Sequence, residues 1–253
     1  MITRKTIFFL FIIATSQTPL KVQSQDATEI VRKADQKFQG EKSSISTMKM
    51  TIKRPRWERS VTFKSWNKGR DFALSLITDP PNENGQSFLK LKNEMWNWNP
   101  TINRITKLPP SMMSQGWMGS DISNDDILKE SSIVTDYTHK ILGNEIVLES
   151  ECYKIELVPK ENTAVVWGRV IIWISVGGFD QLKTEYYDED GKLVRTEISG
   201  EIKKMDDREI PTYFEIIPAD KSGNKTTARI LSIKFNVPIE DSFFSQQNMK
   251  KAR

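Results

Sequence analysis

Two residue types that build most catalytic and metal sites are nearly absent from this sequence of 253 residues. Cys152 is the single cysteine and His139 the single histidine, which excludes an internal disulfide and a site built from several histidines. The sequence also has no G-x-S-x-G elbow, no H-E-x-x-H pair and no glycine-rich phosphate loop. We therefore expect no catalytic residues, no metal and no cofactor, and a hydrolase is the least favoured alternative.

Long apolar runs are missing as well. The apolar stretch 7–14 is too short to span a bilayer, which needs roughly 20 residues, but it has the length of a secretory h-region. Val22-Gln23-Ser24 follows it with the small or aliphatic residues of a cleavage site. We predict a signal peptide over residues 1–24 and one domain over residues 25–253. An uncleaved anchor or a buried N-terminal strand is the alternative.

Most of the net positive charge belongs to that N-terminal segment. The formal net charge is +4, and Arg4, Lys5 and Lys21 supply three of these charges without any acidic residue among the first 24. Their removal leaves the domain close to neutral. No basic stripe is visible elsewhere, so nucleic acid is not predicted as a partner. A charged fraction of 28% argues against an integral membrane protein.

One helix is predicted at the start of the domain. Asp26 is a good N-cap, Glu29 stands three residues later as in a capping box, and Gly40 is a plausible stop. The apolar residues between them follow helical spacing and would pack on a sheet. They are Ile30, Val31, Ala34 and Phe38.

Most of the remaining sequence has the two-residue period of strands. Met48, Met50 and Ile52, for example, alternate with polar residues. Tight turns such as Asp190-Gly191 separate the segments, which predicts a long antiparallel meander that curls into a barrel or a sandwich. The strand-like segments are 48–52, 61–65, 72–76, 88–91, 95–98, 102–105, 145–148, 153–158, 165–176, 182–187, 193–198, 212–217 and 228–237.

The meander is interrupted at residues 109–135. Ser123 and Asp126 resemble a capping box, which predicts a short helix near 124–130 with Asp125 and Asp126 in its first turn. Before it comes an apolar segment that contains Met112, Met113, Trp117 and Met118. Such side chains suit a surface that adapts to flexible apolar chains, although plugging of a barrel end explains them slightly better from the residues alone.

Seven tryptophans are many for this length. Trp96 and Trp98 share one face of a predicted strand, where stacking on a sugar or a nucleic acid base is conceivable. Burial in a core or in the wall of a cavity is the better default for such large apolar side chains.

An ordered series of short motifs resembles the LolA-like family of outer-membrane lipoprotein-sorting proteins. The similarity covers essentially the whole predicted domain, and no single motif is diagnostic. The motifs are Ser65 to Phe72, Asp79-Pro80-Pro81, Gly85 to Lys90, Glu94 to Pro100, Gly119-Ser120-Asp121, Asp125 to Leu128, Asp136-Tyr137, Tyr187 to Lys192 and Ile210-Pro211-Thr212.

The resemblance implies a mainly β (α+β) fold. Its strongly curved antiparallel sheet would form an unclosed barrel, with a short N-terminal helix and a mid-chain helical insert over the concave face. It further implies an apolar cavity that shelters acyl chains in the periplasm. On this interpretation the ligand-binding residues are expected among Met112, Met113, Trp117 and Met118 as a lid, with Trp96 and Trp98 in the lining.

The function implied is that of a soluble, monomeric periplasmic carrier of lipidated proteins or lipids toward the outer membrane. An inner-membrane transporter and an outer-membrane acceptor would be its further partners. Two alternatives are an accessory protein of a lipid export pump and a sensor of mislocalised lipoproteins in an envelope stress response.

Overall fold

The computed structural model describes residues 26–39, 42–129 and 132–252; the predicted signal peptide and the helix stop at Gly40 lie outside these ranges. The helices are α1 Ala27–Gln39, η1 Pro110–Met112, η2 Trp117–Gly119, α2 Asn124–Leu128, η3 Asp241–Phe243 and α3 Gln246–Met249. The strands are β1 Ser43–Arg54, β2 Trp57–Lys68, β3 Phe72–Asp79, β4 Ser87–Leu91, β5 Glu94–Asn99, β6 Arg104–Lys107, β7 Tyr137–Val147, β8 Ser150–Pro159, β9 Arg169–Ser175, β10 Gln181–Tyr187, β11 Leu193–Met205, β12 Arg208–Pro218 and β13 Lys225–Phe235.

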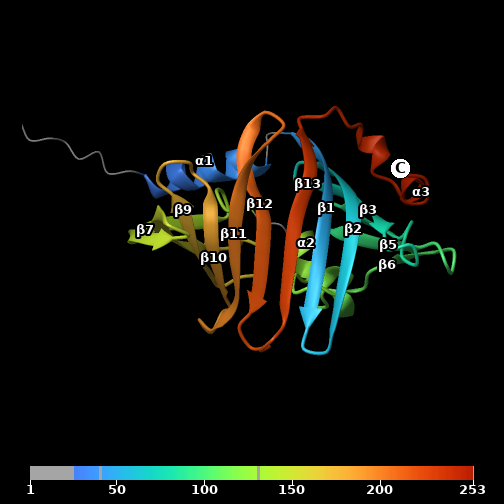
Figure 1. Cartoon of the computed structure of the whole chain (residues 1–253), viewed down its shortest axis with the longest axis horizontal. Helices are drawn as coiled ribbons and strands as arrows, with labels where there is room; N and C mark the ends of the chain where they lie inside the picture. The colour runs from blue at the N-terminus through green and yellow to red at the C-terminus, as the bar shows by residue number, and fades with distance from the viewer. Residues whose placement is uncertain (1–25, 40–41, 130–131, 253) are drawn as a thin grey trace, which may run out of the picture.

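All the strands belong to one antiparallel sheet made of two meanders. The first meander runs from β1 to β6 and the second from β7 to β13, and they join where β1 pairs with β13. This junction makes β6 and β7 the two edges of the sheet, so the sheet does not close. The strands curve around α1 and α2 (Figure 1). The predicted fold class is confirmed.

The chain order explains why a helical insert crosses the sheet. Strands β6 and β7 are consecutive in sequence but lie at opposite edges, so the connection between them, described at residues 108–129 and 132–136, crosses one face. This insert contains η1, η2 and α2. We call the face that it crosses the concave face.

The cross-strand register shows which residues of each strand lie on the concave face, because directly opposed residues point to the same side of the sheet. Met50 lies opposite both Val61 and Ala228, and Ala228 lies opposite Phe214. In the second meander, Thr184 lies opposite Ile172 on the same face. The alternation predicted for residues 48–52 therefore selects the concave side for Met50.

Helix α1 covers the part of the concave face formed by the second meander. The backbone N–H of Thr28 donates to Asp26 Oδ1 at 3.0 Å, which confirms the predicted N-cap. The predicted stripe is buried at Ile30, Val31 and Ala34. Phe38 is the exception: its side chain is 38% exposed. Its ring meets the Phe214 ring edge-on, with 5.6 Å between the ring centroids.

The observed strands differ in their bounds from the predicted segments; the segment predicted at 102–105 is displaced to β6, and two further cases share one cause. The segment predicted at 145–148 is the end of β7, which begins at Tyr137 after the insert. The segment predicted at 165–176 pairs only over β9, and residues 165–168 form part of the preceding loop instead. In both places apolar residues continue beyond the paired backbone, so the hydrophobic pattern alone does not locate the end of the strand.

Residues after β13 form a C-terminal cover on the other face of the first meander. Phe244, Met249 and Ala252 are buried there against Trp66, which belongs to β2. Ser87 Oγ donates to the Met249 carbonyl at 2.8 Å and fixes the segment to β4. Among the described residues, no helix has the length and apolar character needed to cross a membrane.

Candidate functional site

A cavity of about 420 Å³ lies on the concave face, between α1, the insert and the second meander. This volume falls within the range of sites that take small apolar ligands. Most of its walls are apolar. Helix α1 contributes Ala34 and Phe38, β9 contributes Val170 and Ile172, and the insert contributes Ile122.

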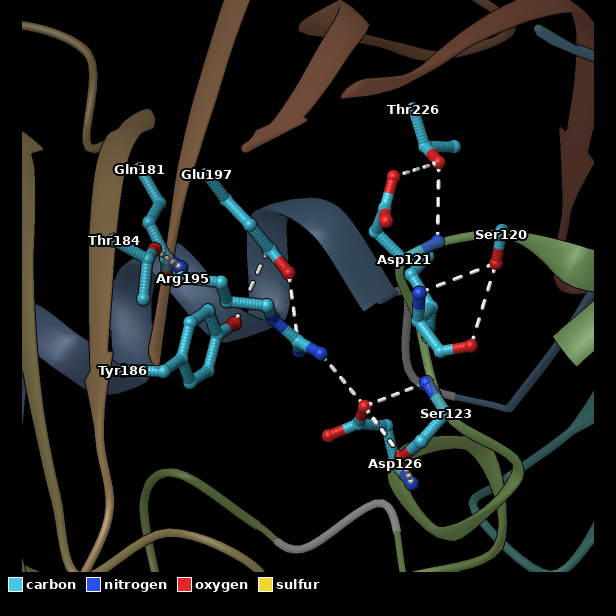
Figure 2. A network of polar contacts seen from close by, with 11 residues as sticks. Ser120, Asp121, Ser123, Asp126, Gln181, Thr184, Tyr186, Arg195, Glu197 and Thr226 are labelled. Atoms are coloured by element: carbon cyan, nitrogen blue, oxygen red, sulfur yellow. Dashed lines mark hydrogen bonds and ion pairs between the residues drawn. The ribbon is translucent and has the colours of Figure 1, made fainter. Parts of the chain in front are cut away.

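The polar part of the wall is centred on Arg195 of β11 (Figure 2). Its guanidinium pairs with Asp126 of α2 at 2.6 Å and with Glu197 of β11 at 3.1 Å. The same group stacks on Tyr186 and Trp167, with 4.4 and 4.8 Å to the ring centroids. Because the Arg195 side chain is only 8% exposed, this cluster is a desolvated charge group inside an otherwise apolar wall.

The cluster changes the proton affinity of its members. Burial raises the pKa of the Tyr186 hydroxyl, and the neighbouring Glu197 carboxylate raises it further. Burial alone would lower the pKa of Arg195, but Glu197, Tyr186 and Asp126 together raise it above its usual value. Arg195 therefore stays cationic and Tyr186 stays neutral over the physiological range.

Asp126 holds the cluster and the start of α2 at the same time. Ser123 Oγ accepts from the Asp126 N–H at 3.0 Å, and Asp126 Oδ2 accepts from the Ser123 N–H at 2.8 Å. The predicted capping box is therefore confirmed. The same Oδ2 atom accepts from Arg195, so the cap of the insert is joined directly to the sheet.

A second anchor fixes the insert at the Gly119-Ser120-Asp121 motif (Figure 2). Asp121 Oδ2 accepts from Thr226 Oγ1 at 2.6 Å and pairs with Arg54 Nη1 at 2.9 Å. Arg54 also donates to the Gly119 carbonyl at 3.1 Å. Gly119 has a φ of +79°, a conformation that glycine adopts without strain. The motif thus attaches the insert to β1 and β13.

Ion pairs also hold α1 at the cavity. Lys37 pairs with Asp180 at 2.5 Å and donates to the Gly178 carbonyl at 2.9 Å. Asp35 pairs with Arg70 at 2.8 Å. Helix α1 is therefore connected to the β9–β10 loop on one side and to the first meander on the other.

The predicted lid residues lie in the insert but outside the cavity wall. Trp117 and Met118 are buried in a cluster with Met50 and Phe63, and the Trp117 ring meets the Phe63 ring edge-on at 5.5 Å. Met113 packs on the same cluster. Met112 is half-buried in η1. Their role in ligand binding stays a prediction.

The predicted lining residues Trp96 and Trp98 lie on the opposite face of the sheet. They do share one strand face, as the alternation indicates, but that face lies under the C-terminal cover with Phe244 and Met249. Neither borders the cavity. Sequence reasoning could not place them, because it could not tell which side of β5 the insert would cross.

Arg195, Glu197 and Tyr186 were missed by sequence reasoning. On their own strand faces they stand next to polar residues such as Ser199 and Thr184, as they would on a solvated face. No local signal separates this buried network from an exposed one, because its burial comes from α1 and the insert.

The described residues contain no group of three or more His, Cys, Asp or Glu side chains arranged to hold a metal. His139 lies between α1 and the end of the insert, where its ring nitrogens contact Thr28 Oγ1 at 3.1 Å and the Ile133 carbonyl at 2.6 Å. Cys152 is buried, and burial raises the pKa of its thiol. The two hydrogen bonds of His139 and the burial of Cys152 indicate structural roles for both residues.

A family model described as "-like: Uncharacterized protein" matches residues 69–251, which is more than half of the chain. The chain belongs to this family. The matched range includes the insert, the strands that carry the Arg195 cluster, and Asp121 and Thr226 of the second anchor, but not Arg54. No curated protein matches the sequence significantly.

Solved structures share the fold. A DUF1329 family protein from Desulfovibrio piger superposes with a TM-score of 0.78 at 23% identity, covering 88% of this chain and 97% of its own. A LolA superfamily protein from Nitrosomonas europaea gives 0.73 at 23% identity, covering 88% and 99%. A Vibrio parahaemolyticus domain named for outer-membrane lipoprotein sorting gives 0.72 at 20% identity, covering 89% and 98%. The resemblance to the LolA-like family is therefore confirmed for the fold.

Proposed function

We propose that this protein is a non-enzymatic carrier that shelters acyl chains in the cavity on its concave face. The observation that carries the proposal is the cavity of about 420 Å³, with largely apolar walls, that α1 and the insert leave against the sheet. An acyl chain costs about 0.8 kcal/mol in water for each exposed CH₂ group, so a dry apolar wall supplies the binding energy directly.

We further propose a cellular location and a class of cargo. The N-terminal sequence supports export to the periplasm, and the fold shared with a domain named for lipoprotein sorting supports lipidated proteins or lipids as cargo. Transfer toward the outer membrane then needs only different affinities at the donor, the carrier and the acceptor. No covalent step is involved.

The proposal also assigns roles to two covers. Helix α1 and the insert each border the cavity, and ion pairs attach each of them to the sheet beside the apolar contacts of Val31 and Trp117. Opening of either cover would expose the cavity to a ligand. The predicted lid residues would then move with the insert.

The test is native mass spectrometry of the chain, expressed with its own N-terminus and purified from a periplasmic extract without detergent. We expect an additional mass that corresponds to a lipid or a lipidated protein. A ligand-free mass that persists after incubation with a triacylated peptide and with phospholipid would contradict the proposal.

A pair of variants on β11 locates the binding site. Ser199 lines the cavity, so Ser199→Phe should fill part of it and weaken acyl binding. Thr196 lies on the same strand and points to the opposite face, so Thr196→Phe adds an equal ring outside the cavity. Equal binding by both variants would place the ligand elsewhere.

A further inference from the structure

The charges that border the cavity have a common property: each cation is already paired. Lys37 pairs with Asp180, Arg70 with Asp35, and Lys129 with Asp125 at 3.0 Å. Arg195 pairs with both Asp126 and Glu197. Each described lining cation therefore already has a carboxylate partner, and among their buried nitrogen atoms only the Nε donors of Arg70 and Arg195 are left without a hydrogen-bond partner.

The buried cluster itself carries an excess of negative charge. Two carboxylates, Asp126 and Glu197, share the single guanidinium of Arg195. The side chains of Arg195 and Asp126 are 8% and 9% exposed, so water screens this excess poorly. A carboxylate or phosphate brought to this end of the cavity would meet net repulsion and would have to break an existing ion pair.

The same cluster has unused hydrogen-bonding capacity. Arg195 Nε, a donor, and Asp126 Oδ1, an acceptor, are buried without a hydrogen-bond partner in the protein. Unpaired buried groups are costly, and a ligand group that pairs with them recovers that cost. Both atoms lie just beneath the cavity surface, so a small rotation of the Arg195 and Asp126 side chains would let an uncharged hydroxyl or amide pair with this donor and acceptor.

We propose that the cavity selects acyl ligands whose polar end is an uncharged hydroxyl or amide, and that it discriminates against free fatty acid carboxylates. This inference rests on the proposed carrier function and specifies its ligand. The apolar wall formed by Val170, Ile172 and Phe38 binds the acyl chain of the ligand, and the Arg195 cluster selects its polar head group.

The experiment compares three ligands of equal chain length: dodecanoic acid, dodecanamide and monododecanoylglycerol. Calorimetric titrations are made below the micellar concentration, at a mildly alkaline pH where the acid is ionised. We expect the amide and the glyceride to bind roughly tenfold or more tightly than the acid. The two uncharged ligands separate an amide-bearing cargo from a hydroxyl-bearing one.

Substitutions in the cluster should change the preference in steps. Glu197→Gln removes one carboxylate and should reduce the discrimination against the acid. Asp126→Asn combined with Glu197→Gln leaves Arg195 without a carboxylate partner, so the acid should become the preferred ligand. Glu185→Gln is the control, since this residue lies on the opposite face of β10 and should leave the preference unchanged.

The outcomes are distinguishable. Equal affinity for acid, amide and glyceride would overturn the head-group inference and leave the carrier function standing. Failure of all three ligands to bind would overturn both. If the double variant does not fold, as judged by urea unfolding, then unchanged discrimination in the Glu197→Gln variant alone is sufficient to overturn the inference.

Discussion

The two halves of the sheet differ in how their faces are covered. In the first meander, the insert fills the concave face with Trp117, and the C-terminal cover buries Phe244 on the other face. In the second meander, α1 and the insert leave a cavity on the concave face. On its other face, Trp173 is buried between the side chains of Lys154 and Lys183.

This difference concerns where the insert's apolar cluster and the proposed binding cavity lie in the sheet. The first meander has a layer of apolar side chains on each face, and such layers contribute strongly to the free energy of unfolding. The second meander also buries apolar side chains on both faces, under α1 and around Trp173, but its concave face keeps the cavity of about 420 Å³. The proposed ligand site and the insert's apolar cluster around Trp117 thus lie in different halves of one sheet.

The largest effect is expected from Trp117→Ala in the first meander. Trp117 is 7% exposed and contacts the rings of both Phe63 and Phe88. Removing such a buried ring should lower the free energy of unfolding by about 3–5 kcal/mol. Urea unfolding followed by circular dichroism measures the change, and acyl binding measured well below the transition should persist.

Trp167→Ala is the matched change in the second meander. Trp167 is only half-buried, and it lines the cavity beneath the Arg195 guanidinium. We expect a smaller loss of stability, about 1–2 kcal/mol, together with clearly weaker acyl binding. If the two variants lost stability and binding in equal measure, the division between the halves would be wrong.

Much of this architecture could be predicted from residue patterns, because its signals are local. The Asp26 cap, the Ser123–Asp126 capping box and the alternation around Met50 each depend on residues within one turn or one strand. Their physical causes lie within a few residues of the sequence, so these patterns predict the starts of α1 and α2 and most strands, whereas η3 and α3 are not among the predicted elements.

The cavity could not be predicted in the same way, because it depends on which face the insert crosses. The Met and Trp side chains of the insert are predicted to form a lid, and in the structure Trp117 and Met118 pack against Phe63 in the first meander. The actual wall takes Arg195 from β11 and Ala34 from α1. Residues so far apart in sequence are brought together only by the join of the two meanders.

An intermediate effect is expected from Tyr186→Phe in the cavity wall. The hydroxyl of Tyr186 donates to Glu197 at 3.2 Å, and its loss should cost about 1 kcal/mol near neutral pH. The pKa of Tyr186 is raised by burial. The folded state therefore holds this proton more tightly than the unfolded chain, in which a tyrosine titrates at about 10.

The sign of the resulting pH dependence follows from linkage. Stability from Tyr186 is complete below pH of about 10 and is lost as the pH rises above that value. The Tyr186→Phe variant should lose less stability than the wild type on the alkaline side. Tyr213, whose pKa burial raises to about 12, provides the comparison through Tyr213→Phe. Parallel alkaline curves for wild type and Tyr186→Phe would show that the hydroxyl is not desolvated.

The smallest effect is expected from Lys154→Met on the outer face of the second meander. Lys154 pairs with Glu145 at 2.6 Å and lies over the Trp173 ring at 5.2 Å. The hydrogen bond from Lys154 is the main reason that the pKa of Glu145 is lowered, followed by that from Trp173. Because Glu145 is 49% exposed, the whole contribution should stay below about 1 kcal/mol.

This contribution is present above the unfolded pKa of Glu145 and is lost as the pH falls through its lower folded value. The wild type and Lys154→Met should therefore differ in stability near neutral pH and converge under acid conditions, and added salt should narrow the difference. Met keeps the apolar cover over Trp173, so the comparison isolates charge from packing. A loss as large as that of Trp117→Ala would mean that Lys154 completes a core on this face, and the contrast between the two meanders would then be confined to their concave sides.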